Sequence, residues 1–248
     1  MQNTTEILDI QNVSKSYGKN TALQDVNFSI SAGKIVGLLG PNGSGKTTLI
    51  KIIMGLLSDY TGTAHINGES PSSATNAVIS YLPDKFHIPS WLTVRQSVKL
   101  FADFYTDFES DRANNMLEAM KIPLNKKIKS LSRGMREKAG LSLVMSRRAK
   151  LFVLDEPIGA VDPAGRDFII ETILGNFSRE SAILLSTHII ADIEPILDTA
   201  IFIKDGVIVL NEEVDKIRQE QNTSLDQLFR EMFAHTYARL PEDRTGEN

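Results

Sequence analysis

The chain has 248 residues, 42% of them hydrophobic and 23% charged, which is typical of a globular protein large enough for one core plus a small subdomain. The net charge of −4 argues against a broad nucleic-acid-binding surface, and the absence of cysteine excludes disulfides and thiolate metal sites, as fits a reducing compartment. The first residues lack a secretion signal and no apolar run approaches the roughly 20 residues that span a bilayer, so any membrane work is expected to need another chain.

The first third of the chain carries strand and turn signals around one glycine-rich segment. Short apolar runs predict strands at 7–13, 22–30, 35–39 and 78–82. A turn that carries Tyr17 separates the first two strands, and residues 63–66 run into an Asn-Gly turn. Pro83 ends the last strand. A helix is expected after the glycine-rich segment, and Gly55 is placed to end it.

Helical spacing of apolar residues replaces this pattern in the middle of the chain. It predicts helices at 93–105, with Thr93 as the N-cap, at 110–120 and at about 133–147. Strand signals then return at 151–154, at 183–186 and in an Asp-Gly hairpin over 201–209, with a helix after Pro163. A C-terminal helix is expected over 224–240, with Ser224 and Gln227 as a capping box, before a polar tail from Pro241. The middle region therefore looks like a helical insert in an α/β frame.

The glycine-rich segment fits the phosphate-loop pattern G-x-x-x-x-G-K-[ST]. Its residues are Gly40, Pro41, Asn42, Gly43, Ser44, Gly45, Lys46, Thr47 and Thr48. Glycines allow backbone N–H groups to point at a phosphate, and the N-terminus of the following helix adds partial positive charge. Lys46 is expected to reach the β- and γ-phosphates and Thr47 to ligate Mg²⁺. The segment predicts a bound nucleoside triphosphate without indicating how its energy is used.

Two adjacent carboxylates follow the apolar strand at 151–154. The carboxyl ends of strands in open α/β sheets are where ligands bind. Neighbouring side chains at a strand end point in different directions, so Asp155 can face Mg²⁺ while Glu156 faces an attacking water. Phosphoryl transfer needs such positioning and charge neutralisation, and this pair therefore belongs with the phosphate loop.

Further motifs follow in a fixed order along the chain. They are Leu131-Ser132-Arg133-Gly134 at a helix start, Asp155-Glu156-Pro157, Ala160-Val161-Asp162, and Ser186-Thr187-His188 after a strand. Together with the phosphate loop, this order resembles the ATP-binding subunits of ABC transporters, from Tyr17 to about Leu210. The resemblance implies an α/β fold: a P-loop NTPase core with an N-terminal antiparallel β subdomain and an inserted α-helical subdomain. We expect an ATP-binding domain over 1–223, with the helical insert at about 84–148, and a C-terminal helix and tail over 224–248.

The resemblance also implies roles for single residues. Tyr17 matches the aromatic residue that stacks on adenine, although a tyrosine packed in its turn is a competing interpretation. Glu156 matches the general base. His188 matches the histidine that contacts the γ-phosphate and orients Glu156 and water, and Lys46 completes the implied catalytic set. ATP and Mg²⁺ are the implied ligands.

The motif that begins at Ser132 matches the family's signature, L-S-G-G-Q. In the family, Ser132 and Gly134 would hold the γ-phosphate of ATP bound to the opposite subunit, and Asp162 would link the two sites across the dimer. Arg133 replaces the usual first glycine, and Met135 replaces the usual glutamine. Both changes weaken the match but leave the serine hydroxyl and the glycine N–H.

Asp84 is a third departure, because the family usually has glutamine after this strand. A carboxylate is a hard oxygen ligand and suits Mg²⁺, directly or through water. It lacks the hydrogen-bond donor of an amide, so it cannot position a water by donating to it as the family's glutamine can. We therefore assign Asp84 to the metal site, with Thr47 and Asp155.

Two other clusters lie in the helical region. Nine basic residues gather between positions 126 and 150 with one acid: Lys126, Lys127, Lys129, Arg133, Arg136, Lys138, Arg147, Arg148 and Lys150. They indicate attraction to ATP across a dimer or to anionic lipid, or only a solvated helix face. Aromatic residues from Phe86 to Phe108 are expected mostly to pack the helical core, with Phe86 and Trp91 as candidate contacts to the membrane partner.

The resemblance predicts an ATPase that powers a separate transmembrane permease and pairs with a second ATP-binding subunit, identical or a close paralogue. It would lie in the cytoplasm against the inner face of the cell membrane, and no nucleic acid is expected. The short Tyr-Leu-Pro-Asp loop and the single domain resemble exporters of drugs, peptides or antibiotics. Two alternatives stay open: a soluble ABC ATPase of DNA repair or translation, and a weakly hydrolysing nucleotide-dependent regulator.

Overall fold

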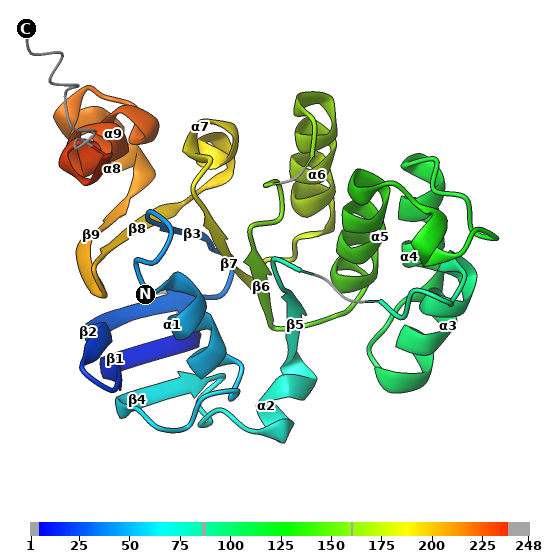
Figure 1. The fold of residues 1–248 in the computed structure, drawn as a ribbon, viewed down its shortest axis with the longest axis horizontal. Helices are drawn as coiled ribbons and strands as arrows, with labels where there is room; N and C mark the ends of the chain where they lie inside the picture. The colour runs from blue at the N-terminus through cyan, green and yellow to red at the C-terminus, as the bar shows by residue number, and fades with distance from the viewer. Residues whose placement is uncertain (1–4, 86–87, 160, 238–248) are drawn as a thin grey trace, which may run out of the picture.

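The computed structural model describes residues 5–85, 88–159 and 161–237, which form two sheets and a helical region (Figure 1). The strands are β1 (Glu6–Tyr17), β2 (Asn20–Ser31), β3 (Ile35–Leu39), β4 (Thr61–Ile66), β5 (Ile79–Leu82), β6 (Leu151–Asp155), β7 (Ala182–Thr187), β8 (Thr199–Lys204) and β9 (Val207–Glu213). The α-helices are α1 (Lys46–Ile53), α2 (Ser73–Val78), α3 (Val94–Phe104), α4 (Ser110–Ala119), α5 (Arg133–Met145), α6 (Pro163–Asn176), α7 (Ile190–Ile193), α8 (Val214–Gln221) and α9 (Leu225–Tyr237). Short 3₁₀ turns cover Ile128–Ser130 and Glu194–Ile196.

A small antiparallel sheet in the order β2-β1-β4 lies against a larger sheet in the order β5-β6-β7-β3-β8-β9 (Figure 1). The larger sheet is parallel except for β9, which pairs antiparallel with β8. This arrangement confirms the predicted α/β class and its antiparallel subdomain. No helix of the described residues is long and apolar enough to cross a membrane.

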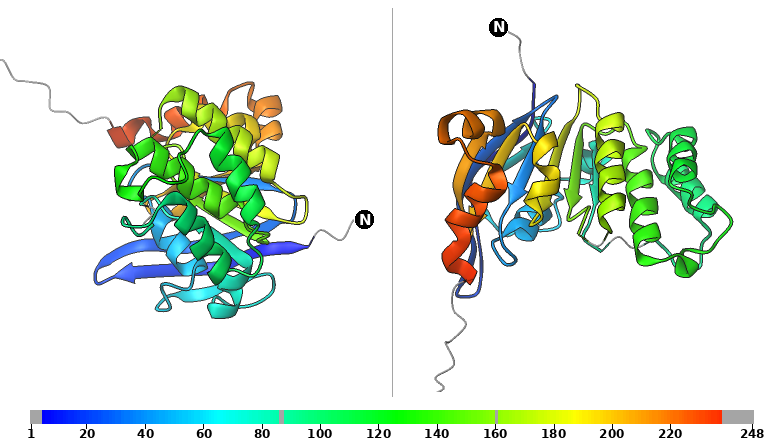
Figure 2. Two further views of the ribbon diagram at one scale, coloured as in Figure 1. Left: turned by 90° about the vertical axis from the view of Figure 1, so that its right-hand side faces the viewer. Right: turned by 90° about the horizontal axis from the view of Figure 1, so that it is seen from above.

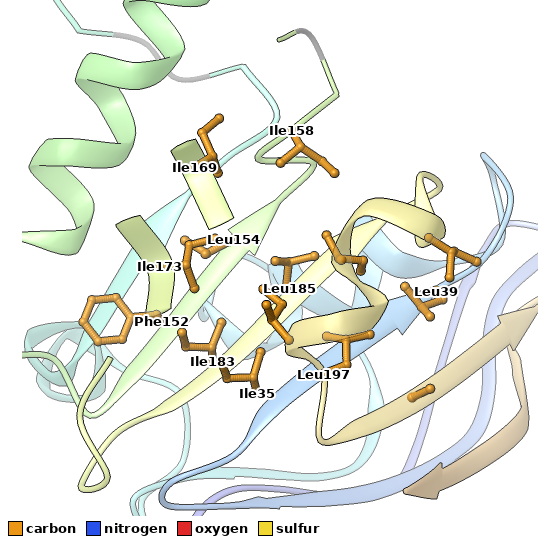
Figure 3. Packing of buried hydrophobic residues seen from close by; sticks show 14 of the residues in the cluster. Ile35, Leu39, Phe152, Leu154, Ile158, Ile169, Ile173, Ile183, Leu185 and Leu197 are labelled. Atoms are coloured by element: carbon orange, nitrogen blue, oxygen red, sulfur yellow. The ribbon is translucent and has the colours of Figure 1, made fainter. Parts of the chain in front are cut away.

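The central strands β3, β6 and β7 are buried along their whole length. Parallel strands covered on both faces read as continuous apolar runs, as these do. One face packs on α1 and the antiparallel sheet, and the other packs on α6, the segment after α7, and α9. Figure 3 shows Ile169 and Ile173 of α6 beside Phe152, Leu154 and Ile183 of the sheet.

The helical region α3–α5 extends from one end of the sheet (Figure 2) and has a hydrophobic cluster of its own. Thr93 caps α3 in a full capping box with Gln96, which confirms the predicted N-cap. Helix α5 contributes Leu141, Val144 and Met145 to the main core and other residues to the helical cluster, so it joins the two parts. The domain boundaries given above stay predictions.

Helix α5 ends at Met145 rather than at the predicted Arg147. The Arg147 side chain is buried and donates to the carboxylate of Asp107 and to the backbone oxygens of Ala77 and Ile79. These bonds satisfy a buried cation and tie α5 to the start of β5. Arg147 is therefore part of the core, not of a basic surface.

Several other elements differ from the prediction. The first hairpin is longer, because Tyr17 pairs with Asn20 and thus ends β1 instead of lying in a turn. Helices α2, α7 and α8 were not predicted, since each spans eight residues or fewer and carries little periodicity. Helix α9 keeps half of its predicted capping box: the Ser224 hydroxyl accepts from the Gln227 N–H, but the Gln227 side chain turns to Glu231. The predicted end of this helix at Leu240, the tail, Phe86 and Ala160 lie outside the described residues.

Candidate functional site

The phosphate loop connects β3 to α1 through a backbone that two glycines make possible. Gly45 has a φ of 111°, and a Cβ added there would lie 2.6 Å from the carbonyl oxygen of Ala22. A Cβ added at Gly40 would lie 2.4 Å from the carbonyl oxygen of Ile203. Both positions therefore require glycine, for different reasons: Gly45 for conformation and close approach, Gly40 for close approach alone.

Lys46 is buried at the start of α1 and donates to the carbonyl oxygens of Gly40 at 2.7 Å and Pro41 at 3.1 Å. The ammonium group thus lies against the start of the phosphate loop, in which Lys46 was predicted to bind phosphate. Burial lowers the pKa of Lys46, while Glu156 and Asp155 act in the opposite direction. Nearby, the Ser44 hydroxyl is buried without a hydrogen-bond partner. An unpaired buried hydroxyl and a nearby cation fit an anionic ligand such as a phosphate group.

The ends of β6 and β7 bring the two predicted carboxylates together with hydroxyl groups of the neighbouring strand. Asp155 is buried and accepts a hydrogen bond from the hydroxyl of Ser186, its partner in the parallel register. Burial raises the pKa of Asp155; Glu156 and Asp84 raise it further, while the bond from Ser186 and the charge of Lys46 lower it. A buried carboxylate among other acids favours a cation nearby. The surroundings of Asp155 therefore suit a metal ligand.

Glu156 adopts a left-handed conformation with a φ of 52°, which is uncommon for a residue other than glycine. Its N–H donates to the carbonyl oxygen of Ser186 at 2.9 Å, so the sheet holds this turn. One carboxylate oxygen, Oε2, lies 2.9 Å from Nδ1 of His188 and accepts from the Thr187 hydroxyl at 3.1 Å. The structure therefore places the Glu156 carboxylate beside His188 and Thr187.

A cavity of about 790 Å³ opens between this edge of the sheet and the helical region. On the sheet side, acidic residues line it: Asp84, Asp155 and Glu156. His188 and Asn42 also line it. On the helical side, the lining includes Lys129, Arg133, Arg136 and Glu137, and Lys85 follows Asp84 in the segment after β5. Asp84 therefore faces the same cavity as the carboxylate pair.

The signature residues lie at the start of α5. The Ser132 hydroxyl caps the helix by accepting from the Met135 N–H at 3.2 Å, and a Cβ added at Gly134 would meet nothing within 4 Å. Arg133 is exposed and pairs with Glu137 one turn along the helix. Met135 packs partly against the helical cluster. Among these four residues, only Arg133 lines the cavity of its own chain.

Tyr17 and Asp162 stand apart from the cavity. The Tyr17 side chain is 47% exposed, with the Lys15 ammonium 5.0 Å from its ring centroid, so this tyrosine is not packed into a core. Asp162 caps α6 by accepting from the Gly165 N–H at 2.8 Å. The hydroxyl groups of Ser186 and Thr187 donate to Asp155 and Glu156, and no role was predicted for them from the sequence. Their position before His188 at a strand end was the available signal.

Comparisons with known proteins agree with this geometry. Residues 23–159 match the family model described as ABC transporter. The lantibiotic transport ATP-binding protein SrtF of Streptococcus pyogenes is 32% identical, over 84% of this chain and 92% of that protein. The Nod factor export ATP-binding protein I of Burkholderia orbicola is 31% identical, over 80% of this chain and 68% of that protein.

A solved structure described as the ATP-binding subunit of an ABC transporter superposes with a TM-score of 0.82 at 28% identity, covering 91% of this chain and 99% of that one. Fold, motif order and family model all point the same way. The family's ATP-binding domains are ATPases that power transport and act with a membrane permease component. The chain therefore belongs to the ABC transporter family, as one of its ATP-binding, ATP-hydrolysing subunits.

Proposed function

We propose that this subunit hydrolyses ATP with Glu156 as the general base, in the Mg²⁺-dependent, dimeric cycle of an exporter. The observation that carries the catalytic part is the position of the Glu156 carboxylate, held by His188 and Thr187 at the edge of the cavity. Glu156 would accept the proton of the attacking water. His188, whose Nδ1 contacts Oε2 of Glu156, would orient the carboxylate and contact the γ-phosphate.

The phosphate loop binds the triphosphate through its backbone N–H groups and Lys46, which exchanges its two loop carbonyls for phosphate oxygens. Ser44 supplies an unpaired hydroxyl at the same place. The exposed ring of Tyr17, which the Lys15 ammonium approaches to 5.0 Å from its centroid, would stack on adenine. Asp155, Thr47 and Asp84 would hold Mg²⁺, which neutralises phosphate charge when bound. The buried Asp155 carboxylate with its raised pKa supports this assignment.

A second ATP-binding subunit completes the site in this proposal. Ser132 and Gly134 lie at the first turn of α5, where backbone N–H groups lack intrahelical partners and favour an anion. Neither residue lines the cavity next to Glu156 of the same chain, which is consistent with binding the ATP of the opposite subunit. Asp162, at the start of α6, would lie in the same interface.

The membrane partner would contact the helical region. Trp91 and Phe104 are 69% and 75% exposed, so both rings are accessible to a partner. Phe104 was expected to pack the helical core, so its exposure adds a contact candidate beside Trp91. The lantibiotic and Nod-factor relatives support export of a peptide, antibiotic or related compound. In this proposal the subunit is cytoplasmic and peripheral on the membrane.

Turnover of a Glu156→Gln variant tests the catalytic assignment. The change keeps the side chain's volume and the nucleotide site but removes the base, so the ATPase rate should fall roughly 10²–10⁴-fold. Glu180→Gln is the matched control, because Glu180 is 85% exposed and paired only weakly with Lys150. A Glu156→Gln protein that turns over normally refutes the assignment. A wild type that hydrolyses poorly would instead favour the regulator, as Asp84, Arg133 and Met135 suggest.

The same variant tests the dimer. Because ATP remains bound, Glu156→Gln should dimerise with ATP but not with ADP, as read by light scattering. Adding Ser132→Arg should abolish that dimer and leave ATP binding by the monomer largely intact. A double variant that still dimerises with ATP would contradict the proposed role of the signature.

A further inference from the structure

The two residues proposed for catalysis come from different segments of the chain. Glu156 precedes the loop that leads into α6, and His188 precedes α7. Their side chains meet at 2.9 Å, but the His188 side chain is half exposed, so this contact lies at the solvent edge of the cavity. The pairing of β6 with β7 fixes the strand ends before these two residues, and a connection between the segments after them would further limit their relative movement.

Arg166, in the first turns of α6, makes that second connection. Its Nη1 lies 2.7 Å from the Oδ2 of Asp192 in α7, and its Nε donates to the carbonyl oxygen of Val161 at 3.1 Å. One planar guanidinium thus bonds to the loop after Glu156 and to the helix after His188. The fork geometry of arginine matches two acceptors at once, which lysine does not.

Val161 of this loop, which accepts the bond from Arg166, packs closely against the start of α6, so Arg166 is bonded to a fixed part of the backbone. Val161 is buried, and a Cβ added at Gly165 would lie 2.3 Å from its side chain. Asp162 caps the helix through Gly165, and the Arg166 N–H donates to the Asp162 carbonyl oxygen at 3.0 Å. The Arg166 side chain is therefore a polar connection between this loop and α7, beside the core packing of Val161, Ile190 and Ile193.

We propose that Arg166 is a positioning residue for ATP hydrolysis, holding the Glu156 loop and α7 at the separation at which His188 meets Glu156. The inference rests on the proposed roles of Glu156 and His188. Arg166 does not touch the phosphate loop in any contact of the described residues, so it acts on the chemical step and not on nucleotide binding. The pair with Asp192 is partly exposed, 26% and 35%, so it contributes little to global stability.

Steady-state ATPase kinetics of Arg166→Ala, Arg166→Lys and Asp192→Asn test the proposal. Each single change should lower kcat roughly 10- to 100-fold, as small misplacements of catalytic groups do. KM for ATP should stay within about twofold, because the ground-state contacts to ATP are intact. The double variant Arg166→Ala/Asp192→Asn should be no worse than Arg166→Ala alone, since both changes break one connection. Lysine should recover part of the rate.

Arg218→Ala is the matched control. Arg218 bonds to Glu194, two residues beyond Asp192, but connects it to α8 and not to the loop after Glu156. Its kcat should equal that of the wild type. Equal losses of kcat in Arg218→Ala and Arg166→Ala would mean that any loosening of α7 matters, and the proposal would be wrong.

The outcomes separate this inference from the proposed function. An inactive Glu156→Gln protein together with an unchanged kcat in Arg166→Ala and Asp192→Asn overturns the role of Arg166 alone. Normal turnover by Glu156→Gln overturns the proposed base, whatever Arg166 does. If Arg166→Ala fails to fold, Asp192→Asn decides the question, because it removes the charge at nearly constant volume.

Discussion

Truncation of Phe233 to alanine should strongly destabilise the protein, although the residue lies in the last helix. Phe233 is 1% exposed and belongs to the main hydrophobic core. Its ring centroid lies 4.3 Å from that of Phe229 and 6.0 Å from that of Phe202. Phe202 in β8 pairs with Leu39, the last residue of β3 before the phosphate loop. Helix α9 therefore covers the strands that support the nucleotide site.

The magnitude follows from burial. Removing a fully buried phenylalanine ring costs about 3–5 kcal/mol, from lost transfer free energy and the cavity left behind. For a chain of this size, each kcal/mol lowers the melting temperature by roughly 2–4 °C, so a fall of about 6–20 °C is expected. Urea unfolding of the nucleotide-free protein, followed by circular dichroism, measures the cost directly.

Phe104→Ala is the control, because the same chemical change at a 75% exposed ring should alter the unfolding free energy by no more than about 0.5 kcal/mol. A cost below about 1 kcal/mol for Phe233→Ala would refute the reasoning. It would mean that α9 undocks before the rest of the protein unfolds. Its contacts with Phe202 and Phe229 would then add nothing to the stability of the sheet.

Three further predictions concern the nucleotide site. Tyr17→Ala should weaken ATP binding by about 1–3 kcal/mol in a titration, the range of a lost aromatic–base stack; unchanged affinity would rule out stacking. Asp84→Ala should raise the Mg²⁺ concentration for half-maximal hydrolysis, and Asp84→Gln should restore part of it; an unaltered dependence would leave the metal to Thr47 and Asp155. Burial raises the pKa of Asp155, so the folded protein binds the proton more tightly than the unfolded chain does. The ionised carboxylate therefore destabilises the fold, and this destabilisation increases as pH rises from the pKa of the unfolded chain to that of the folded protein. Asp155→Asn should therefore raise the melting temperature of the metal-free protein at neutral pH, with the gain vanishing in acid, and a lower value at neutral pH would contradict the assigned cause.

Local sequence patterns predicted most of the longer helices and strands, and the family resemblance implied how they are arranged. The buried runs that became β3, β6 and β7, the phosphate loop before α1 and the capped start of α3 are local patterns, and local patterns can be read from sequence. Short elements were not predicted, because they contain too little local pattern to be recognised. Helices α7 and α8 carry too few residues for periodicity, and most of their helical stability comes from packing: Ile190 and Ile193 of α7 and Val214 and Ile217 of α8 are buried in the main core.

Residue chemistry also identified most candidate site residues before their geometry was known. Gly40, Lys46, Asp155 and Glu156 follow from what phosphates and Mg²⁺ require, and the family resemblance added His188. The exposure of these side chains and their hydrogen-bond partners could not be predicted from the sequence. The sequence left open whether Tyr17 was packed or free, and its exposed ring was decided by the longer β1–β2 hairpin that carries it.

The contacts that tertiary structure alone decided join residues far apart in the chain. Asp155 receives its hydrogen bond from Ser186 because β6 and β7 are parallel neighbours in a particular register. Arg147 was counted in the basic cluster of the sequence, but its side chain is buried and bonds to Asp107 and to two backbone oxygens. Arg166 had no signal at all. Which partner a charged side chain reaches depends on how helices pack over the sheet, and that packing is a collective result of the whole core rather than of any local pattern.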